Sequence, residues 1–332
     1  MSAFQNVTVV GAGAWGTALA ATARRAGRTT RLYAREPEVA DAVNKGVGNP
    51  VYLKDVPLPD GITASTDLGE AVEDTEVVIL VVPAQFLRST AAALTGTLSR
   101  GVPVILAAKG IEQGSQMLMS EVAEETLPGY PIAVLSGPSF AAEVARALPA
   151  ALTLASADET LGKQLIDTLA GPMFRLYQSN DLIGAEIGGA VKNVLAIACG
   201  IVEGRGLGDN ARAALITRGL AEMVRLGLTK GATRETMMGL AGLGDLVLTC
   251  NAMQSRNFSF GYALGQGKSP EDILADRIAV TEGVTSAVSV TELARSIGIE
   301  MPICDAVHAI VHQGRDIDTA MTMLMARPLT FE

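Results

Sequence analysis

The chain has 332 residues, of which 48% are hydrophobic and 18% charged; this composition is typical of a globular protein with one large or two ordinary domains and excludes a disordered chain. Its net charge of −9 comes without a run of Lys or Arg, which argues against a nucleic-acid-binding protein. The three cysteines are odd in number and widely spaced, so we expect a cytoplasmic protein without disulfides or a zinc site. No apolar run reaches the length of a membrane span without a charge or a glycine cluster, and we expect no integral membrane segment.

Short apolar runs alternate with helical patterns in the first half of the chain. Each run is four to six residues long and is bounded by Gly, Pro or polar turns, as in buried strands. The predicted strands are Val7–Val10, Thr30–Tyr33, Val77–Val82, Val102–Ala107, Ile132–Leu135 and Ala151–Ala155. This alternation predicts a doubly wound, Rossmann-type parallel sheet over residues 1–180.

Helical periodicity dominates the second half of the chain. The predicted helices are Asp181–Glu203, Asn210–Leu228, Thr233–Leu248, Thr285–Ser296 and Pro302–Gln313. We therefore predict an α/β fold in which an all-α C-terminal domain, residues 181–332, follows the Rossmann domain.

A glycine-rich turn directly follows the first predicted strand and opens a helix. Gly11, Gly13 and Gly16 have the GxGxxG spacing, with Ala14 and Trp15 inside the motif. In this motif, glycine permits a tight turn, lets a pyrophosphate approach the backbone and lets the helix pack closely on the strand. The turn therefore predicts a dinucleotide site.

Arg35 stands just after the second predicted strand, where an NAD site usually has Asp or Glu on the ribose 2′-hydroxyl. A guanidinium suits the 2′-phosphate of NADP(H), so NADP(H) is favoured over NAD(H). The alternative is a solvated Arg35, with Glu36 in the usual acidic role and NAD(H) as the cofactor.

Two turns follow later strands, at the edge where open α/β sheets bind ligands. Lys109 comes after one strand, and Gly137 and Ser139 come after the next. Lys109 is a ligand candidate or a surface lysine. The second turn has backbone N–H groups and a hydroxyl that either face a ligand or cap the helix that follows.

Lys192 is an isolated charge in the first helix of the second half. Its neighbours one helical turn away are small or apolar, and none is a carboxylate. Such a lysine either snorkels to solvent or is desolvated, which lowers its pKa into the range useful for acid–base chemistry. Asp245, in an apolar and glycine-rich run, either pairs with Lys192 or caps a helix.

Ser255, Arg256 and Asn257 form a compact set of donors suited to a phosphate. The alternative is a loop that contains this triplet by chance. His308 and His312 are four residues apart but lack a third ligand, so no metal site is predicted.

Longer segments carry a family signature. They are Gly11–Ala20, Val82–Pro83, Lys109–Glu112, Ser136–Ala145, Glu186–Asn193, Gly208–Gly219, Gly239–Thr249, Ser255–Asn257 and Glu282–Val284. Together they resemble, almost from end to end, the bacterial NAD(P)-dependent glycerol-3-phosphate dehydrogenase family. Related two-domain dehydrogenases share only the first segment and the general layout.

The resemblance implies reversible reduction of dihydroxyacetone phosphate to sn-glycerol 3-phosphate, for phospholipid synthesis, by a homodimer in which Lys192 is the proton donor and acceptor. The implied substrate contacts are Lys109, Gly137, Ser139, Lys192, Asp245, Ser255, Arg256 and Asn257. The implied cofactor contacts, beside Gly11, Gly13 and Gly16, are Ala14, Trp15, Arg35, Lys109, Ala141, Arg256, Val280 and Glu282. Where the family often has Val-Glu-Gly, this chain has one residue more between Val280 and Glu282.

Two other functions compete with this one. Another Rossmann dehydrogenase with a helical second domain would act on a carboxylate such as a 3-hydroxy acid, and turnover with each substrate separates the two. A non-catalytic NADP(H) sensor would bind the cofactor tightly without turnover, and it would leave the buried lysine without a use.

Overall fold

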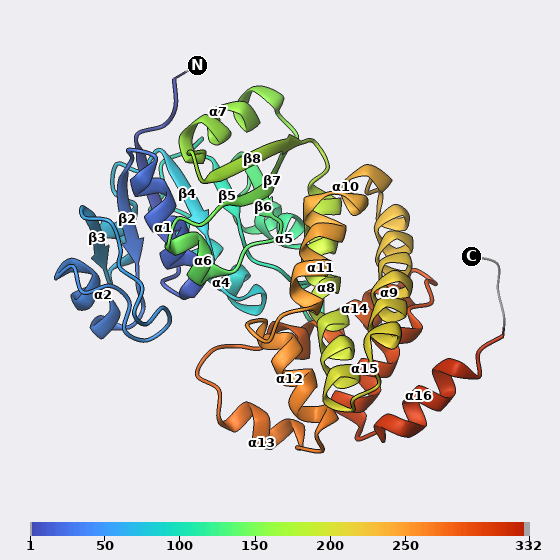
Figure 1. Ribbon diagram of the computed structural model, residues 1–332. Coiled ribbons are helices and arrows are strands. Elements are labelled where there is room, and N and C mark those ends of the chain that lie inside the picture. The colour runs from blue at the N-terminus through green and yellow to red at the C-terminus, as the bar shows by residue number, and fades with distance from the viewer. Residues whose placement is uncertain (1, 329–332) are drawn as a thin grey trace. The chain divides into compact units, whose positions relative to one another are not determined.

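The computed structural model describes residues 2–328 (Figure 1), and its first half is built on one eight-stranded sheet. The sheet has the order β3-β2-β1-β4-β5-β6-β7-β8. Its strands are β1 (Asn6–Val10), β2 (Thr29–Tyr33), β3 (Ile62–Ser65), β4 (Val77–Leu80), β5 (Val104–Leu106), β6 (Ile132–Ser136), β7 (Ala150–Ser156) and β8 (Phe174–Ser179). The strand order reverses between β1 and β4, which is the switch point where doubly wound sheets bind ligands.

The predicted parallel sheet is confirmed, with one exception and two additions. β7 runs antiparallel to β6, whereas the other neighbouring pairs are parallel. The sequence pattern missed β3 and β8, the two edge strands. In β8 buried Phe174 and Leu176 alternate with exposed residues, so this strand lacks the continuous apolar run that marks a strand covered on both faces.

The described chain divides into two compact units, one of residues up to 112 with 117–186 and one of residues 113–116 with those from 187 on. The helices of the first unit are α1 (Ala14–Arg25), α2 (Pro37–Asn44), α3 (Leu68–Val72), α4 (Leu87–Leu94), α5 (Met119–Thr126), α6 (Ala141–Ala145) and α7 (Glu159–Leu169), with a short 3₁₀ turn η1 (Ala84–Phe86). The core of this unit joins α1 to the sheet, with Leu19, Val9 and Ile79 fully buried.

The second unit is helical, as predicted. Its helices are α8 (Leu182–Gly204, which starts in the last residues of the first unit), α9 (Asp209–Lys230), α10 (Arg234–Met238), the π-helical turn η2 (Leu240–Gly244), α11 (Asp245–Cys250), α12 (Arg256–Gly265), α13 (Pro270–Ala275), α14 (Glu282–Ser296), α15 (Pro302–Gln313) and α16 (Ile317–Met325). The last residues of the predicted domain, 329–332, lie outside the described residues.

The prediction of one helix over Thr233–Leu248 is wrong, because the chain breaks there into α10, η2 and α11. Gly239 leaves the helical conformation with ψ −160°, and the wider π turn follows it. Glycine is a poor helix former, and π turns occur often at functional sites. The break places Asp245 at the first position of a new helix.

α8 is the most apolar long helix in the described part of the chain. By length and composition it could cross a membrane, but its apolar window of 18 residues is wholly buried within the fold. Three glycines let other helices approach its backbone; a Cβ on Gly200 would lie 2.1 Å from the carbonyl oxygen of Phe258. The hydrophobicity of α8 is therefore used in helix packing.

Candidate active site

The glycine turn after β1 tolerates no side chain at two of its positions. Gly11 has φ +115°, and a Cβ there would lie 2.7 Å from the carbonyl oxygen of Val81. A Cβ on Gly16 would lie 1.8 Å from the carbonyl oxygen of Gly11. Close contact among β1, β4 and α1 thus depends on these glycines.

The N-terminus of α1 has the properties of an anion site. Gly13 is the N-cap, no side chain caps the helix, and the first turn contains no acidic residue. A Cβ on Gly13 would meet nothing within 4 Å, so the turn has room in front of amides that carry the positive end of the helix dipole. The residues present therefore fit a dinucleotide pyrophosphate.

Asn49 supports this turn, and sequence reasoning missed it. Its Nδ2 donates to the carbonyl oxygen of Ala12 and to Thr17 Oγ1, both at 2.8 Å. Its Oδ1 accepts from the backbone N–H groups of Val51 and Tyr52. Asn49 is 37 residues from Ala12 in sequence, and no local pattern indicates such a contact.

Arg35 and Glu36 are in contact with each other after β2. Arg35 Nη2 lies 2.9 Å from Glu36 Oε1, and the Arg35 side chain is 79% exposed. Tyr52 also donates to Glu36 Oε1, at 3.1 Å. Burial raises the pKa of Glu36, but hydrogen bonds from Arg35 and Tyr52 outweigh burial and hold the pKa below its ordinary value. The two candidates for binding the ribose end of the cofactor, Arg35 and Glu36, are therefore both charged and in contact with each other.

The structure brings Lys109, Gly137 and Ser139 together beyond β5 and β6, which are adjacent parallel strands. Lys109 Nζ donates to the carbonyl oxygen of Gly137 at 3.1 Å, and Ser139 Oγ donates to the same oxygen at 3.0 Å. Gly137 has φ +145°, and a Cβ there would touch Leu152 Cα at 3.0 Å. Ala141 follows as the first residue of α6.

Lys192 and Asp245 form a buried ion pair in the second unit, and their predicted contact is confirmed. Lys192 Nζ lies 2.6 Å from Asp245 Oδ1, and the two side chains are 9% and 1% exposed. Lys192 Nζ also donates to Thr249 Oγ1 at 2.9 Å, and Thr249 Oγ1 in turn donates to Asp245 Oδ1 at 3.3 Å. Thr249 follows Asp245 by one helical turn and is the residue that sequence reasoning missed here.

Close backbone packing puts the carboxylate beside the lysine. Gly188 lies on α8 one turn before Lys192, and a Cβ there would be 2.3 Å from the carbonyl oxygen of Ala241 in η2. Any larger residue would push η2, and with it Asp245, away from α8. The apolar surroundings oppose the charged form of Lys192, whereas the carboxylate favours it.

The start of α12 presents the predicted phosphate residues. Ser255 is the N-cap, and its Oγ accepts from the backbone N–H of Phe258 at 3.2 Å. Arg256 is exposed at the first helical position. Arg277, a second arginine that sequence reasoning missed, donates to the carbonyl oxygen of Arg256 at 2.6 Å. Burial and the nearby Arg256 cation lower the pKa of Arg277, so positive charge is concentrated at this helix end.

Val280 and Glu282 lie at the start of α14. Val280 is 42% exposed, and Glu282 is half-buried at the first helical position. The backbone N–H of Gly283 donates to Asn257 Oδ1 at 2.8 Å. The segment that carries the predicted cofactor contacts is therefore joined to the segment that carries Arg256.

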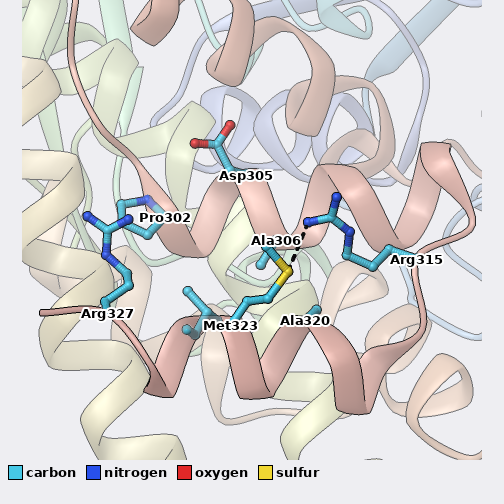
Figure 2. Close-up of a pocket in the computed structure, with 8 residues that line it drawn as sticks. Pro302, Asp305, Ala306, Arg315, Ala320, Met323 and Arg327 are labelled. Carbon is cyan, nitrogen blue, oxygen red and sulfur yellow. Dashed lines mark hydrogen bonds between the residues drawn. The ribbon is translucent and has the colours of Figure 1, made fainter.

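A small hollow of the second unit lies between α15 and α16 (Figure 2). Asp305, Arg315, Met323 and Arg327 are among the residues that line it, and Arg315 Nη1 donates to Met323 Sδ at 3.5 Å. None of the predicted site residues lines this hollow, which is therefore not the candidate active site.

Comparison with known proteins identifies the family of this chain. The family model for the N-terminus of NAD-dependent glycerol-3-phosphate dehydrogenase matches residues 6–162, and the model for its C-terminus matches residues 181–322. A glycerol-3-phosphate dehydrogenase (NAD(P)+) of Caulobacter vibrioides is 56% identical over 326 residues, which are 98% of each chain. The chain belongs to the NAD-dependent glycerol-3-phosphate dehydrogenase family.

Other members of the glycerol-3-phosphate dehydrogenase family extend the match. The enzyme of the same name from Maricaulis maris is 54% identical over 332 residues, covering 100% of this chain and 99% of its own. A crystal structure of glycerol-3-phosphate dehydrogenase from Coxiella burnetii superposes with a TM-score of 0.94 at 41% identity, covering 98% of this chain and 100% of that one. The resemblance inferred from the sequence is thus confirmed, and the chain is an oxidoreductase of a family that uses a nicotinamide cofactor.

Proposed function

We propose that this protein reversibly reduces dihydroxyacetone phosphate to sn-glycerol 3-phosphate, with NADPH as the favoured cofactor and Lys192 as the proton donor and acceptor. One observation supports the role of Lys192 above all: its ammonium group is buried, yet Asp245 Oδ1 at 2.6 Å and Thr249 Oγ1 at 2.9 Å hold it. A buried charge is costly unless it is paired, and it is retained most often where chemistry needs it.

The first unit binds the dinucleotide in this proposal, as expected for the predicted domain 1–180. The amides at the start of α1 bind the pyrophosphate, and Gly11, Gly13 and Gly16 allow it to approach. Arg35 then selects NADPH through the 2′-phosphate, since its guanidinium is 79% exposed and offers donors beyond the one bound to Glu36. When bound, the nicotinamide supplies the hydride that reduces the ketone carbon.

The phosphate of the substrate is bound by the second unit in this proposal. Arg256 binds the phosphate with the planar fork of its guanidinium. The family resemblance implies further substrate contacts. These contacts are Lys109, Gly137, Ser139, Lys192, Asp245, Ser255 and Asn257. In a chain of net charge −9, a local cation site is needed to attract a phosphorylated substrate.

Lys192 acts in its ammonium form in the direction of reduction. It donates a proton from Nζ to the alkoxide that develops on the ketone oxygen, and its charge stabilises that oxygen before transfer is complete. Asp245 keeps Nζ oriented and favours its protonated form. In the reverse direction the neutral amine takes the proton from the hydroxyl of sn-glycerol 3-phosphate.

The remaining parts of the proposal follow from the family resemblance. We expect a cytoplasmic homodimer that supplies glycerol phosphate for phospholipid synthesis and that needs no metal. Sedimentation of the purified chain tests the dimer.

Turnover tests the reaction itself. Oxidation of NADPH and of NADH is followed with dihydroxyacetone phosphate, and reduction of NADP+ and NAD+ is followed with 3-hydroxy acids as competing substrates. We expect turnover with dihydroxyacetone phosphate and a lower KM for NADPH than for NADH. Faster turnover of a 3-hydroxy acid, or tight NADPH binding without any turnover, contradicts the proposed function.

A further inference from the structure

Three predicted site residues of the second unit are each followed directly by a member of one buried cluster. These site residues are Lys192 on α8, Arg256 on α12 and Glu282 on α14. The cluster, named here the amide relay, consists of Asn193, Asn257 and Gly283. The proton donor, the phosphate-binding arginine and the cofactor-contacting carboxylate are therefore attached to one connected group.

Two hydrogen bonds connect the relay, and their directions are fixed. The backbone N–H of Gly283 can only donate, so Asn257 turns Oδ1 toward it, at 2.8 Å. Asn257 then presents Nδ2 to Asn193 Oδ1, also at 2.8 Å. Asn193 and Asn257 are 4% and 8% exposed, so water does not readily replace either bond.

Gly283 brings the three helices to one point. A Cβ at this position would lie 2.6 Å from the carbonyl oxygen of Asn193 and 2.8 Å from Asn257 Oδ1. No side chain fits there unless α14 moves away from α8. The absence of a Cβ thus keeps the start of α14 pressed against both asparagines.

We propose that Asn193, Asn257 and Gly283 are positioning residues that set the distances among Lys192, Arg256 and Glu282. The bond between Asn193 and Asn257 ties the proton donor to the phosphate-binding arginine. The bond between Asn257 and Gly283 connects that arginine to the start of α14, named here the cofactor segment because it carries the predicted cofactor contacts Val280 and Glu282. This inference rests on the roles proposed above, and it gives Asn257 a function that is independent of its predicted contact with the substrate.

The two bonds have separable consequences. Asn193→Leu removes only the acceptor for Asn257, so it disturbs the proton donor relative to the phosphate but leaves the start of α14 in place. Asn257→Leu removes both bonds and releases the cofactor segment as well. Asn257→Asp keeps an acceptor for the N–H of Gly283, and it is the matched control for Asn257→Leu.

The experiment measures two quantities on each variant: the Kd of NADPH without substrate, by fluorescence titration, and kcat/KM for dihydroxyacetone phosphate. We expect Asn257→Leu to raise the Kd of NADPH by about tenfold. Asn257→Asp and Asn193→Leu should keep the Kd of NADPH within about twofold of the wild-type value. Asn193→Leu should lower kcat/KM by about ten- to a hundredfold. Ser289→Ala, which removes a buried hydroxyl without a partner among the described residues of the chain, controls for general loosening of α14 and should change neither quantity.

An unchanged NADPH affinity in folded Asn257→Leu would overturn the proposal, because a residue that only contacts substrate leaves that affinity intact. Equal loss of NADPH affinity in Asn257→Leu and Asn257→Asp would overturn it too. If Asn257→Leu does not fold, Gly283→Ala takes its place, since it keeps both asparagines and separates α14 from them; it should weaken NADPH similarly, and an unchanged Kd refutes the relay. The NADPH titrations need no turnover, so they test the relay even if dihydroxyacetone phosphate is not the substrate.

Discussion

Replacing Lys192 by Met tests the proposed proton donor, but it also disturbs a buried charge. Methionine keeps most of the side-chain volume and removes the ammonium group. Asp245, whose side chain is 1% exposed, then loses the cation that lies 2.6 Å from its Oδ1. Removing one partner of a buried ion pair typically costs about 3–5 kcal/mol. Lys192→Met is therefore expected to lower both activity and stability.

A second variant separates the two effects. Lys192→Met/Asp245→Asn removes both charges, so no carboxylate is left without the cation that it contacts, and most of the lost stability should return. The turnover number should not return, because the proton donor is still missing. We expect kcat to be lower by roughly 10²–10⁴ in both variants, the usual contribution of general acid–base catalysis.

The measurements are the Tm, kcat with dihydroxyacetone phosphate, and the Kd of NADPH, for the wild type, both variants and Asp245→Asn alone. The Kd of NADPH should stay near the wild-type value in Lys192→Met, which shows that the fold of the cofactor site persists. A Lys192→Met/Asp245→Asn variant that keeps more than about a tenth of wild-type kcat excludes Lys192 as the proton donor. A Lys192→Met variant as stable as the wild type would instead show that the ion pair contributes little.

Three further predictions address the cofactor, the phosphate and pH. Arg35→Asp should weaken NADPH binding by about 1.5–3 kcal/mol with little effect on NADH binding. Glu36→Gln should weaken NADH binding if Glu36 binds the ribose. Equal changes of the KM for NADPH and the KM for NADH in Arg35→Asp would refute 2′-phosphate recognition by Arg35. Arg256→Ala should lower kcat/KM for dihydroxyacetone phosphate, relative to unphosphorylated dihydroxyacetone at saturating cofactor, by about 10²–10³; an unchanged ratio removes Arg256 from the phosphate site. Burial raises the pKa of Glu186 to about 7, although hydrogen bonds from Ser120 act in the opposite direction. The folded state therefore keeps a proton that the unfolded chain loses near pH 4.5. The stability that this group contributes is lost as the pH rises to the folded pKa, by roughly 3 kcal/mol. Glu186→Gln should flatten the dependence of Tm on pH between 4.5 and about 7. The slope due to Glu222 remains, because burial raises the pKa of that group to about 7 as well. Parallel profiles for variant and wild type contradict the assignment.

The interior of the sheet could be predicted because its strands are covered on both faces. β4 and β5 are runs of buried apolar residues, and β1 is buried from its second residue on and is mostly valine, which the sequence shows directly. The edge strands β3 and β8 have exposed positions and no such run. The antiparallel direction of β7 was not predictable either, because its apolar pattern is the same for both directions.

The two halves of the candidate site differ in how far the sequence could describe them. The glycine turn is short and continuous in sequence, and a Cβ on Gly16 would lie 1.8 Å from the carbonyl oxygen of Gly11. The spacing of Gly11, Gly13 and Gly16 therefore predicts the turn by itself. In the second unit, the sequence singled out isolated charges in apolar runs, and pairing with Lys192 was one of the two roles that it offered for Asp245. Thr249, Asn193 and Arg277 carry no such signal, because threonine, asparagine and arginine are ordinary residues in helices and loops.

The close backbone contacts that bring these residues together could not be predicted from the sequence. Lys192 and Asp245 are 53 residues apart, and Asn193 and Asn257 are 64 apart. Each pair meets because glycines remove the side chains that would hold two elements apart. These are Gly188 between α8 and η2 in the first case, and Gly200 and Gly261 between α8 and α12 in the second. Glycine lowers helix propensity, so a glycine in a helix counts locally against the structure that it makes possible. Its benefit appears only when the partner backbone is known, and for this reason the charges of the site could be predicted while the connections among them could not.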